Sequence, residues 1–167
     1  MSEKYGIVYS SKTGNTKKLA IYLSQLLSSS AKLYYEIPDY VPKHSILFLG
    51  FGIDKGTCSV ELQEFMQRLH HQTIILFGTC GFSNEVRYHN LLIDNISKNL
   101  AADNTVLDYF MCQGEISIQF KEKYEKALLL NPDDPKMLAS LKIYQESIGH
   151  PNSEDMDHFR EFVFQNI

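Results

Sequence analysis

Ile7-Val-Tyr-Ser-Ser-Lys-Thr-Gly-Asn-Thr16 is the most informative segment of this 167-residue chain. Its apolar start follows Lys4 and leads into a turn where six of the seven residues from Ser10 to Thr16 are Ser, Thr, Asn or Gly. Apolar residues at roughly helical spacing come next, at Leu19, Ile21, Leu23, Leu26 and Leu27. This pattern predicts a buried strand at residues 4–10, a loop of small residues and an amphipathic helix.

The loop from Ser10 to Thr16 is a candidate anion site. The helix after it points its free N–H groups and the positive end of its dipole at the loop. The hydroxyl groups add hydrogen-bond donors, and Gly14 lets the backbone approach a ligand closely. A plain helix cap needs only one such residue. The loop lacks the Walker pattern, the G-x-G-x-x-G fingerprint and the acidic residues of a phospho-accepting receiver domain.

Four more strand-like segments follow, at residues 31–37, 45–51, 73–78 and 105–111, with helices expected between them. This alternation predicts an α/β fold with an open parallel sheet covered by helices on both faces. Ligands of such sheets bind outside the carboxyl ends of the strands. The loops 51–57 and 79–83 are therefore expected to flank the molecule to which the anion belongs.

The sequence after Gly114 is helical, and we expect helices at residues 120–130, 136–148 and 154–166. The first two are additional to an ordinary last crossover. Covering the core is the favoured interpretation of these two helices, and docking of a partner is the alternative.

The composition excludes several classes of protein. With 16 Lys and Arg against 20 Asp and Glu, no basic excess indicates nucleic-acid binding. No apolar run approaches the roughly 20 residues of a membrane span. The three cysteines, Cys58, Cys80 and Cys112, are too scattered for a disulfide framework, and buried structural thiols are favoured over redox groups. We expect one intracellular, cytoplasmic domain over residues 1–167.

The chain resembles the flavodoxin family. The run Ile7 to Ala20 follows the FMN-phosphate signature of flavodoxins at essentially every specified position. Softer similarities to one branch of flavodoxin-domain proteins lie at residues 50–56, 76–79, 112–114 and 150–155. The resemblance implies a three-layer α/β/α sandwich with five parallel strands in the order 2-1-3-4-5, FMN as the cofactor and electron transfer as the usual activity.

The resemblance also implies the site residues. Side chains that would bind the FMN phosphate are those of Ser11, Thr13, Asn15 and Thr16, and backbone N–H groups would come from Lys12 and Gly14. One side of the isoalloxazine would be flanked by Phe51, Gly52, Ile53, Asp54, Lys55 and Gly56, with Thr57 closing the loop. The other side would be flanked by Thr79, Cys80, Gly81 and Phe82. Negative charge that lowers the flavin reduction potential would come from Asp54, Glu61 and Glu64.

One position departs from the pattern of that branch, whose third-strand loop typically reads Gly-Phe-Trp-x-Asp-Lys-Gly. This chain has Gly52 in place of the tryptophan and contains no Trp at all. Unless Phe51, Phe82 or Tyr88 substitutes, one flavin face loses an aromatic contact worth about 0.5–1.5 kcal/mol beyond area burial.

The resemblance favours a low-potential electron carrier that serves intracellular reductases, with a reductase donor and an acceptor protein as partners. Two alternatives stay open. One is an FMN-dependent flavin or quinone reductase, which would need a substrate shelf over the ring. The other is an interaction module that keeps the fold and has lost FMN.

Overall fold

The computed structural model describes residues 3–167; Met1 and Ser2, with which the expected domain begins, lie outside it. Within that range, five parallel strands form one sheet in the order β2-β1-β3-β4-β5, which confirms the predicted topology. The strands are β1 (Tyr5–Ser10), β2 (Ala31–Tyr34), β3 (Ile46–Gly52), β4 (Thr73–Cys80) and β5 (Thr105–Gln113).

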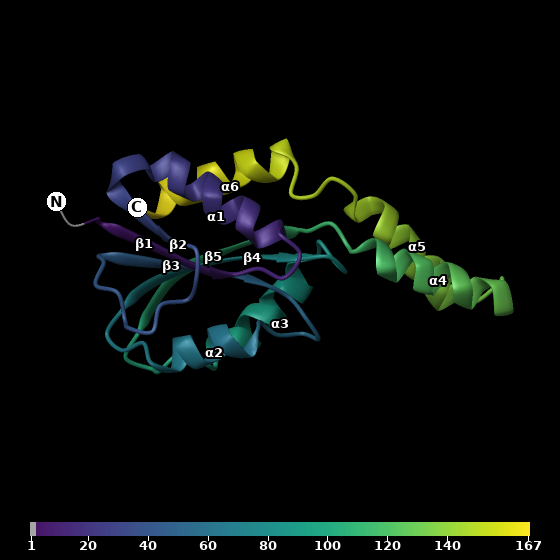
Figure 1. The fold of residues 1–167 in the computed structure, drawn as a ribbon, viewed down its shortest axis with the longest axis horizontal. Coiled ribbons are helices and arrows are strands. Elements are labelled where there is room, and N and C mark those ends of the chain that lie inside the picture. Colours follow the sequence, from purple (N-terminus) through teal and green to yellow (C-terminus); the bar gives the residue numbers. More distant parts are fainter. Residues whose placement is uncertain (1–2) are drawn as a thin grey trace.

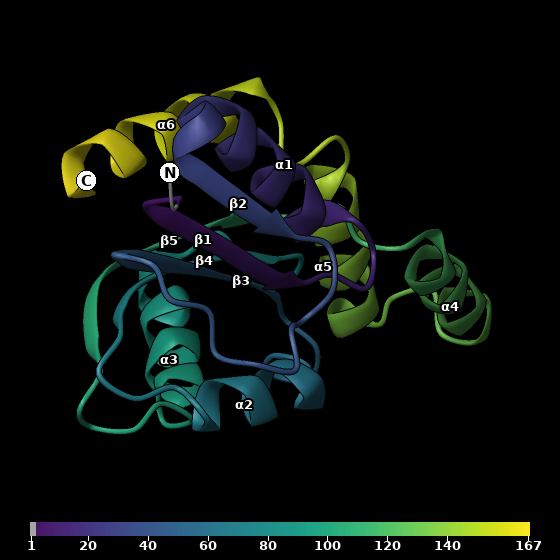
Figure 2. The ribbon, with the colours of Figure 1, turned by 60° about the vertical axis from the view of Figure 1, so that its left-hand side comes forward.

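Helices cover both faces of the sheet, as Figure 2 shows, so the predicted three-layer architecture is confirmed. One layer consists of α1 (Asn15–Leu27), which a short 3-10 turn at Ser28–Ser30 follows, and α6 (Ser153–Asn166). The other layer consists of α2 (Val60–Gln67) and α3 (Val86–Ser97).

Two hydrophobic cores lie between these layers, because successive side chains of a strand point to opposite faces of the sheet. Under α1 and α6, the core contains Ile7, Tyr9, Phe48, Phe77, Leu19, Leu23 and Phe159. Under α2 and α3, it contains Val8, Leu49, Phe51, Leu76, Leu62, Phe65 and Ile96. The cores fix β1, β3 and β4 side by side, and the loops at their carboxyl ends are therefore held close together.

Strand ends differ from the sequence prediction by one residue in β1 and β3 and by two or three residues in β2, β4 and β5. The second strand ends at Tyr34 rather than at residue 37, and Tyr35 is exposed. The fourth strand continues through Thr79 and Cys80, which were expected in a loop. Pairing with β5 explains the extension, because Cys112 and Gln113 lie opposite those two residues in the ladder.

The two additional helices, α4 (Ile118–Leu130) and α5 (Pro135–Ser147), form an antiparallel hairpin that projects beyond the carboxyl edge of the sheet (Figure 1). The expectation that they cover the core is wrong. Their apolar stripes pack on each other instead, with Tyr124 and Tyr144 buried, and Leu129 and Leu130 at the tip are 83% and 90% exposed. Asp134 begins α5 by accepting hydrogen bonds from the N–H groups of the first helical turn.

Across residues 3–167, none of the helices is both long and apolar enough to cross a lipid bilayer.

Candidate functional site

The loop between β1 and α1 presents hydrogen-bond donors at a helix N-terminus. Gly14 begins the helix in the left-handed region, with φ 91°. The hydroxyl oxygen of Ser11 accepts the N–H groups of Gly14 and Lys17, both at 3.2 Å. Within the described range 3–167, the N–H groups of Asn15 and Thr16 donate to no other residue. These two donors, the O–H of Ser11 and the exposed hydroxyl of Thr13 are therefore available to an anion.

Thr16 is buried rather than displayed in the loop. Its side chain is 1% exposed, and its hydroxyl oxygen lies 2.9 Å from that of Thr79 at the end of β4. One of the two O–H groups forms this bond, which leaves the other O–H of the pair as a donor. The Thr16 hydroxyl is thus held by Thr79 and is not exposed at the loop.

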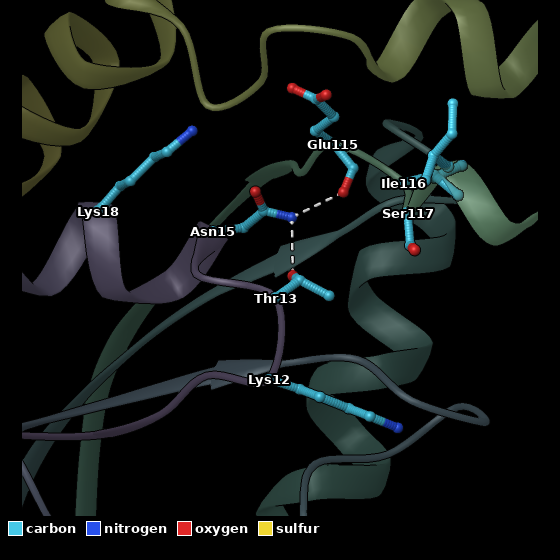
Figure 3. Close-up of a pocket in the computed structure, with 8 residues that line it drawn as sticks. Lys12, Thr13, Asn15, Lys18, Glu115, Ile116 and Ser117 are labelled. Carbon is cyan, nitrogen blue, oxygen red and sulfur yellow. Dashed lines mark hydrogen bonds between the residues drawn. The ribbon is translucent and has the colours of Figure 1, made fainter.

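Asn15 connects the loop to a distant part of the chain. Its side-chain amide donates to Thr13 Oγ1 at 3.2 Å and to the backbone carbonyl of Glu115 at 2.9 Å (Figure 3). The sequence prediction assigned this amide to the phosphate, but both of its N–H groups are engaged within the protein. The backbone N–H of Asn15 is the group left for a ligand. Gly114 permits the contact, because a Cβ there would lie 2.7 Å from Asn15 Nδ2.

The loop after β3 is a tight, well-supported turn. Asp54 and Thr57 exchange backbone hydrogen bonds of 2.9 and 3.2 Å, and Lys55 and Gly56 both have positive φ, as a type I′ turn requires. Neighbouring elements hold the turn, through hydrogen bonds from Asn95 Nδ2 to the carbonyl of Gly56 and from the N–H of Ile53 to the carbonyl of Thr79.

Lys12 joins the two loops electrostatically. Its ammonium lies 3.7 Å from a carboxylate oxygen of Asp54, and both side chains are largely exposed. Such a pair contributes about 0–1 kcal/mol to stability, but it offsets the negative charge that Asp54 brings to the site. Glu61 and Glu64 are exposed on α2. The negative charge that the sequence analysis expects from Asp54 is thus partly offset by Lys12.

Of the three aromatic residues considered as replacements for the missing tryptophan, Phe51 is unavailable. Its ring is fully buried between the sheet and α2, because strand alternation directs it to that face. Gly78 opposite it makes the room, since a Cβ there would lie 2.4 Å from the ring. Phe82 is 45% exposed and meets Phe120 of α4 edge-to-face, with ring centroids 5.8 Å apart. Tyr88 is half-buried.

Gly52 leaves space beside the loops. A Cβ built on it would make only ordinary contacts, 3.6 Å from the hydroxyl oxygen of Thr16 and 4.0 Å from that of Thr79. The position at which the resemblance implies a tryptophan is therefore open in this chain, and it adjoins the hydroxyl pair.

Backbone groups of Cys80 and Gly81, at the end of β4, bond the end of β5. The carbonyl of Cys80 accepts the N–H of Gly114, and the amide of Gln113 donates to the carbonyl of Gly81 at 3.2 Å. Gly81 lies against Ile116, which a Cβ at position 81 would approach to 2.6 Å. This packing fixes the loop that ends in Phe82.

The three cysteines are free and buried, as the sequence analysis favoured. Burial raises the pKa of each thiol, most strongly that of Cys112, because a thiolate would lose its hydration there. No group of three metal-ligating side chains occurs among residues 3–167.

An open cleft of about 580 Å³ lies between the loop at residues 10–16, called the phosphate loop below, and the start of α4. Its lining consists of Lys12, Thr13, Asn15, Lys18, Glu115, Ile116, Ser117 and Ile118 (Figure 3). The ammonium of Lys18, the exposed hydroxyl of Thr13 and the N–H groups of Asn15 and Thr16 form a donor set that suits a phosphate dianion. The residues present thus fit the FMN phosphate that the sequence signature implies.

A family model described as "Flavodoxin domain" matches residues 6–164, from β1 into the last turn of α6. The chain belongs to this family. The match includes the α4–α5 hairpin, and with it the segment around Glu115 that contacts the phosphate loop of this flavodoxin-domain protein. The sequence analysis does not predict that Glu115 contacts the phosphate loop or that Asn95 holds the turn after β3. Gly114 next to Glu115 is a weak local signal, and Asn95 has none.

This flavodoxin-domain protein is similar to two curated relatives and to a solved structure. The flavodoxin-like domain-containing protein BilS of Clostridioides difficile (strain CD3) is 36% identical over 155 residues, which cover 90% of this chain and 88% of the relative. BilS of Clostridium symbiosum (strain WAL-14163) is 29% identical over 182 residues, which cover 98% of this chain and 96% of the relative. A flavoprotein of Lactobacillus acidophilus NCFM, crystallised in complex with FMN, is 14% identical with a TM-score of 0.49, covering 66% of this chain and 93% of its own.

Proposed function

We propose that this flavodoxin-domain protein binds FMN, with the phosphate at residues 11–16, and carries electrons from a reductase to an acceptor protein. One observation carries the proposal. The N–H groups of Asn15 and Thr16 have no acceptor within residues 3–167, and they open a helix inside a complete FMN-phosphate signature. A bound phosphate would supply the missing acceptor and would gain from the helix dipole.

FMN would supply the electron-accepting ring, and the chain would bind and orient the cofactor. The N–H groups of Asn15 and Thr16 and the hydroxyls of Ser11 and Thr13 would hold the phosphate. The turn at residues 52–56 and the loop at 79–82 would flank the ring with backbone groups and with Phe82. Gly52 leaves room there for a planar ring to approach the backbone.

A carrier role suits the charges near this edge. Glu61 and Glu64 are exposed on α2 and would lower the reduction potential of a nearby flavin, whereas Lys12 offsets Asp54. The partners would be a reductase and an acceptor protein, and the cytoplasm would be the site of action.

One observation favours a flavin or quinone reductase as the second candidate. Phe82 and Phe120 form an edge-to-face pair and are 45% and 40% exposed. They come from the loop after β4 and from the additional helix α4. An exposed aromatic pair in this place would give a planar substrate an apolar surface to lie on.

Reconstitution tests these roles in sequence. The protein is titrated with FMN, and flavin fluorescence and the visible spectrum are recorded. Saturable quenching supports cofactor binding, whereas its absence rejects both redox roles and leaves an interaction module. The FMN-loaded protein is then mixed with NADPH under anaerobic conditions. A carrier bleaches only after an NADPH-dependent flavodoxin reductase is added; bleaching by NADPH alone contradicts the carrier and supports a reductase.

A further inference from the structure

Glu115 lies between the phosphate loop and the segment that joins α5 to α6. Its carbonyl oxygen accepts the Asn15 amide at 2.9 Å. Its own N–H donates to the carbonyl of His150 at 2.8 Å, and its carboxylate accepts the N–H of Gly149 at 3.0 Å. Figure 3 shows the carboxylate of Glu115 directed away from Asn15. The residue is thus held on one side and holds the phosphate loop on the other.

A partly buried hydrogen bond between His150 and Asp155 fixes the far side of this connection. His150 Nδ1 lies 2.7 Å from Asp155 Oδ2, which also accepts the N–H of Asn152 at 2.8 Å. The side chain of Asn152 in turn accepts the N–H of Asp155, and together these bonds form a capping box at the start of α6. Asp155 is only 9% exposed, and Phe159 one turn later is fully buried in the core. The segment from Gly149 to Asn152 is therefore anchored to the rigid part of the fold.

We infer that His150 and Asp155 are positioning residues for the phosphate of FMN. They hold the segment at residues 149–152, which holds Glu115, whose carbonyl fixes Asn15 and with it the donors at the start of α1. The inference rests on the proposed function and extends it to two residues that line neither the phosphate loop nor the cleft beside it. A loop fixed before binding loses less conformational entropy when the ligand arrives, so its affinity is higher.

Removal of this pair should leave the fold intact, because the hairpin base has an independent attachment. The N–H of Ile116 donates to the hydroxyl of Ser147 at 3.0 Å, and that hydroxyl donates to the carbonyl of Tyr144. Ser147 is fully buried. Neither bond involves His150 or Asp155, so α4 and α5 stay joined at their base when the pair is lost.

The test compares FMN with riboflavin, which carries the same ring and lacks the phosphate. Affinities are measured by fluorescence quenching for the wild type, His150→Ala, Asp155→Ala and Asp155→Asn. We expect the Kd for FMN to rise about five- to tenfold in the alanine variants, with the Kd for riboflavin unchanged. Asp155→Asn keeps an oxygen that can accept the N–H of Asn152, so it should lose less FMN affinity than Asp155→Ala.

A matched control is Asp157→Asn, an exposed position on the same helix that pairs with Arg160. It should change neither Kd. A double-mutant cycle of Asn15→Ala with Asp155→Ala should be non-additive, since both changes interrupt one path. Equal losses of FMN and riboflavin affinity, or additive effects, would mean that the pair is merely structural.

Hydrogen exchange decides the inference without any flavin. The amides of Gly14 and Lys17, which donate to Ser11, should exchange faster in Asp155→Ala than in the wild type, while core amides of β3 keep their rates. Unchanged exchange at Gly14 and Lys17 overturns the positioning role. A wild type that binds no FMN, by contrast, rejects the proposed function itself.

Discussion

Thr16 and Thr79 share a buried hydrogen bond of 2.9 Å that joins the first turn of α1 to the end of β4. The bond ties the loop at residues 10–16 to the end of β4, the two segments that would flank the proposed cofactor, and Gly52 lies against both hydroxyls. The pair therefore contributes to stability and to the site at once.

Replacing one member of this pair leaves the other hydroxyl buried without a partner. Thr16→Val and Thr79→Val, which keep the side-chain shape, should each lower the free energy of unfolding by about 1–3 kcal/mol. The double variant should lose less than the sum, because no hydroxyl is then left unpaired. Urea denaturation without flavin measures this, and strictly additive losses would show that the bond contributes no coupling.

Thr13 is exposed, and its hydroxyl accepts only from Asn15 among the bonds described above. Thr13→Ala should change the free energy of unfolding by less than about 0.5 kcal/mol and raise the Kd for FMN on the order of tenfold, the loss of one hydrogen bond to a charged group. Thr105→Ala, an exposed threonine at the amino end of β5, is the matched control. An unchanged FMN affinity in Thr13→Ala together with Thr16→Ala would place the phosphate elsewhere.

Gly52→Trp should be tolerated, because the new Cβ meets only ordinary contacts. A ring at this position should tighten FMN binding by about 0.5–1.5 kcal/mol, or roughly two- to tenfold. The chain has no other tryptophan, so the fluorescence of the variant reports on this site alone. FMN should quench it strongly. Phe164→Trp, an exposed position on α6, is the control and should be quenched little.

The buried thiols make stability depend on alkaline pH. Burial raises the pKa of Cys112 in the folded state, so the thiol ionises more readily in the unfolded chain. The stability that depends on the neutral thiol is fully present below the pKa of a free thiol, about 8.5, and is lost as pH rises toward the pKa of the folded state. The wild type should therefore lose more stability between pH 7 and pH 10 than Cys112→Ala. Urea denaturation at both pH values measures the difference, and equal losses would contradict the assigned burial effect.

Local sequence was enough for the sheet and for the phosphate loop. The apolar runs of β1, β3 and β4 are buried on both faces, and such strands are recognisable without knowledge of their neighbours. The hydroxyl-rich loop before α1 is equally local, since a strand, a turn and a helix N-terminus follow one another within a few residues. Residue composition and hydrophobic periodicity are therefore enough to predict the buried strands and the loop.

The hydrogen-bond partners of side chains and the positions of α4 and α5 could be found only in the tertiary structure. Asn15 and Glu115 are 100 residues apart, and no local pattern marks a side chain that bonds a distant carbonyl. An amphipathic stripe predicts that a helix is buried on one face, but it does not say against what, so the hairpin was mistaken for core cover.

The chemistry that the loop at residues 11–16 offers is readable from its residues alone, because hydroxyl, amide and glycine groups are properties of single residues. Which of those groups are free depends on contacts made in the folded chain. Thr16 and Asn15 direct their side chains into the protein and leave backbone N–H groups outward. The physical reason is competition: each polar group bonds the nearest partner that the folded chain provides, and the residues that compete come from distant segments.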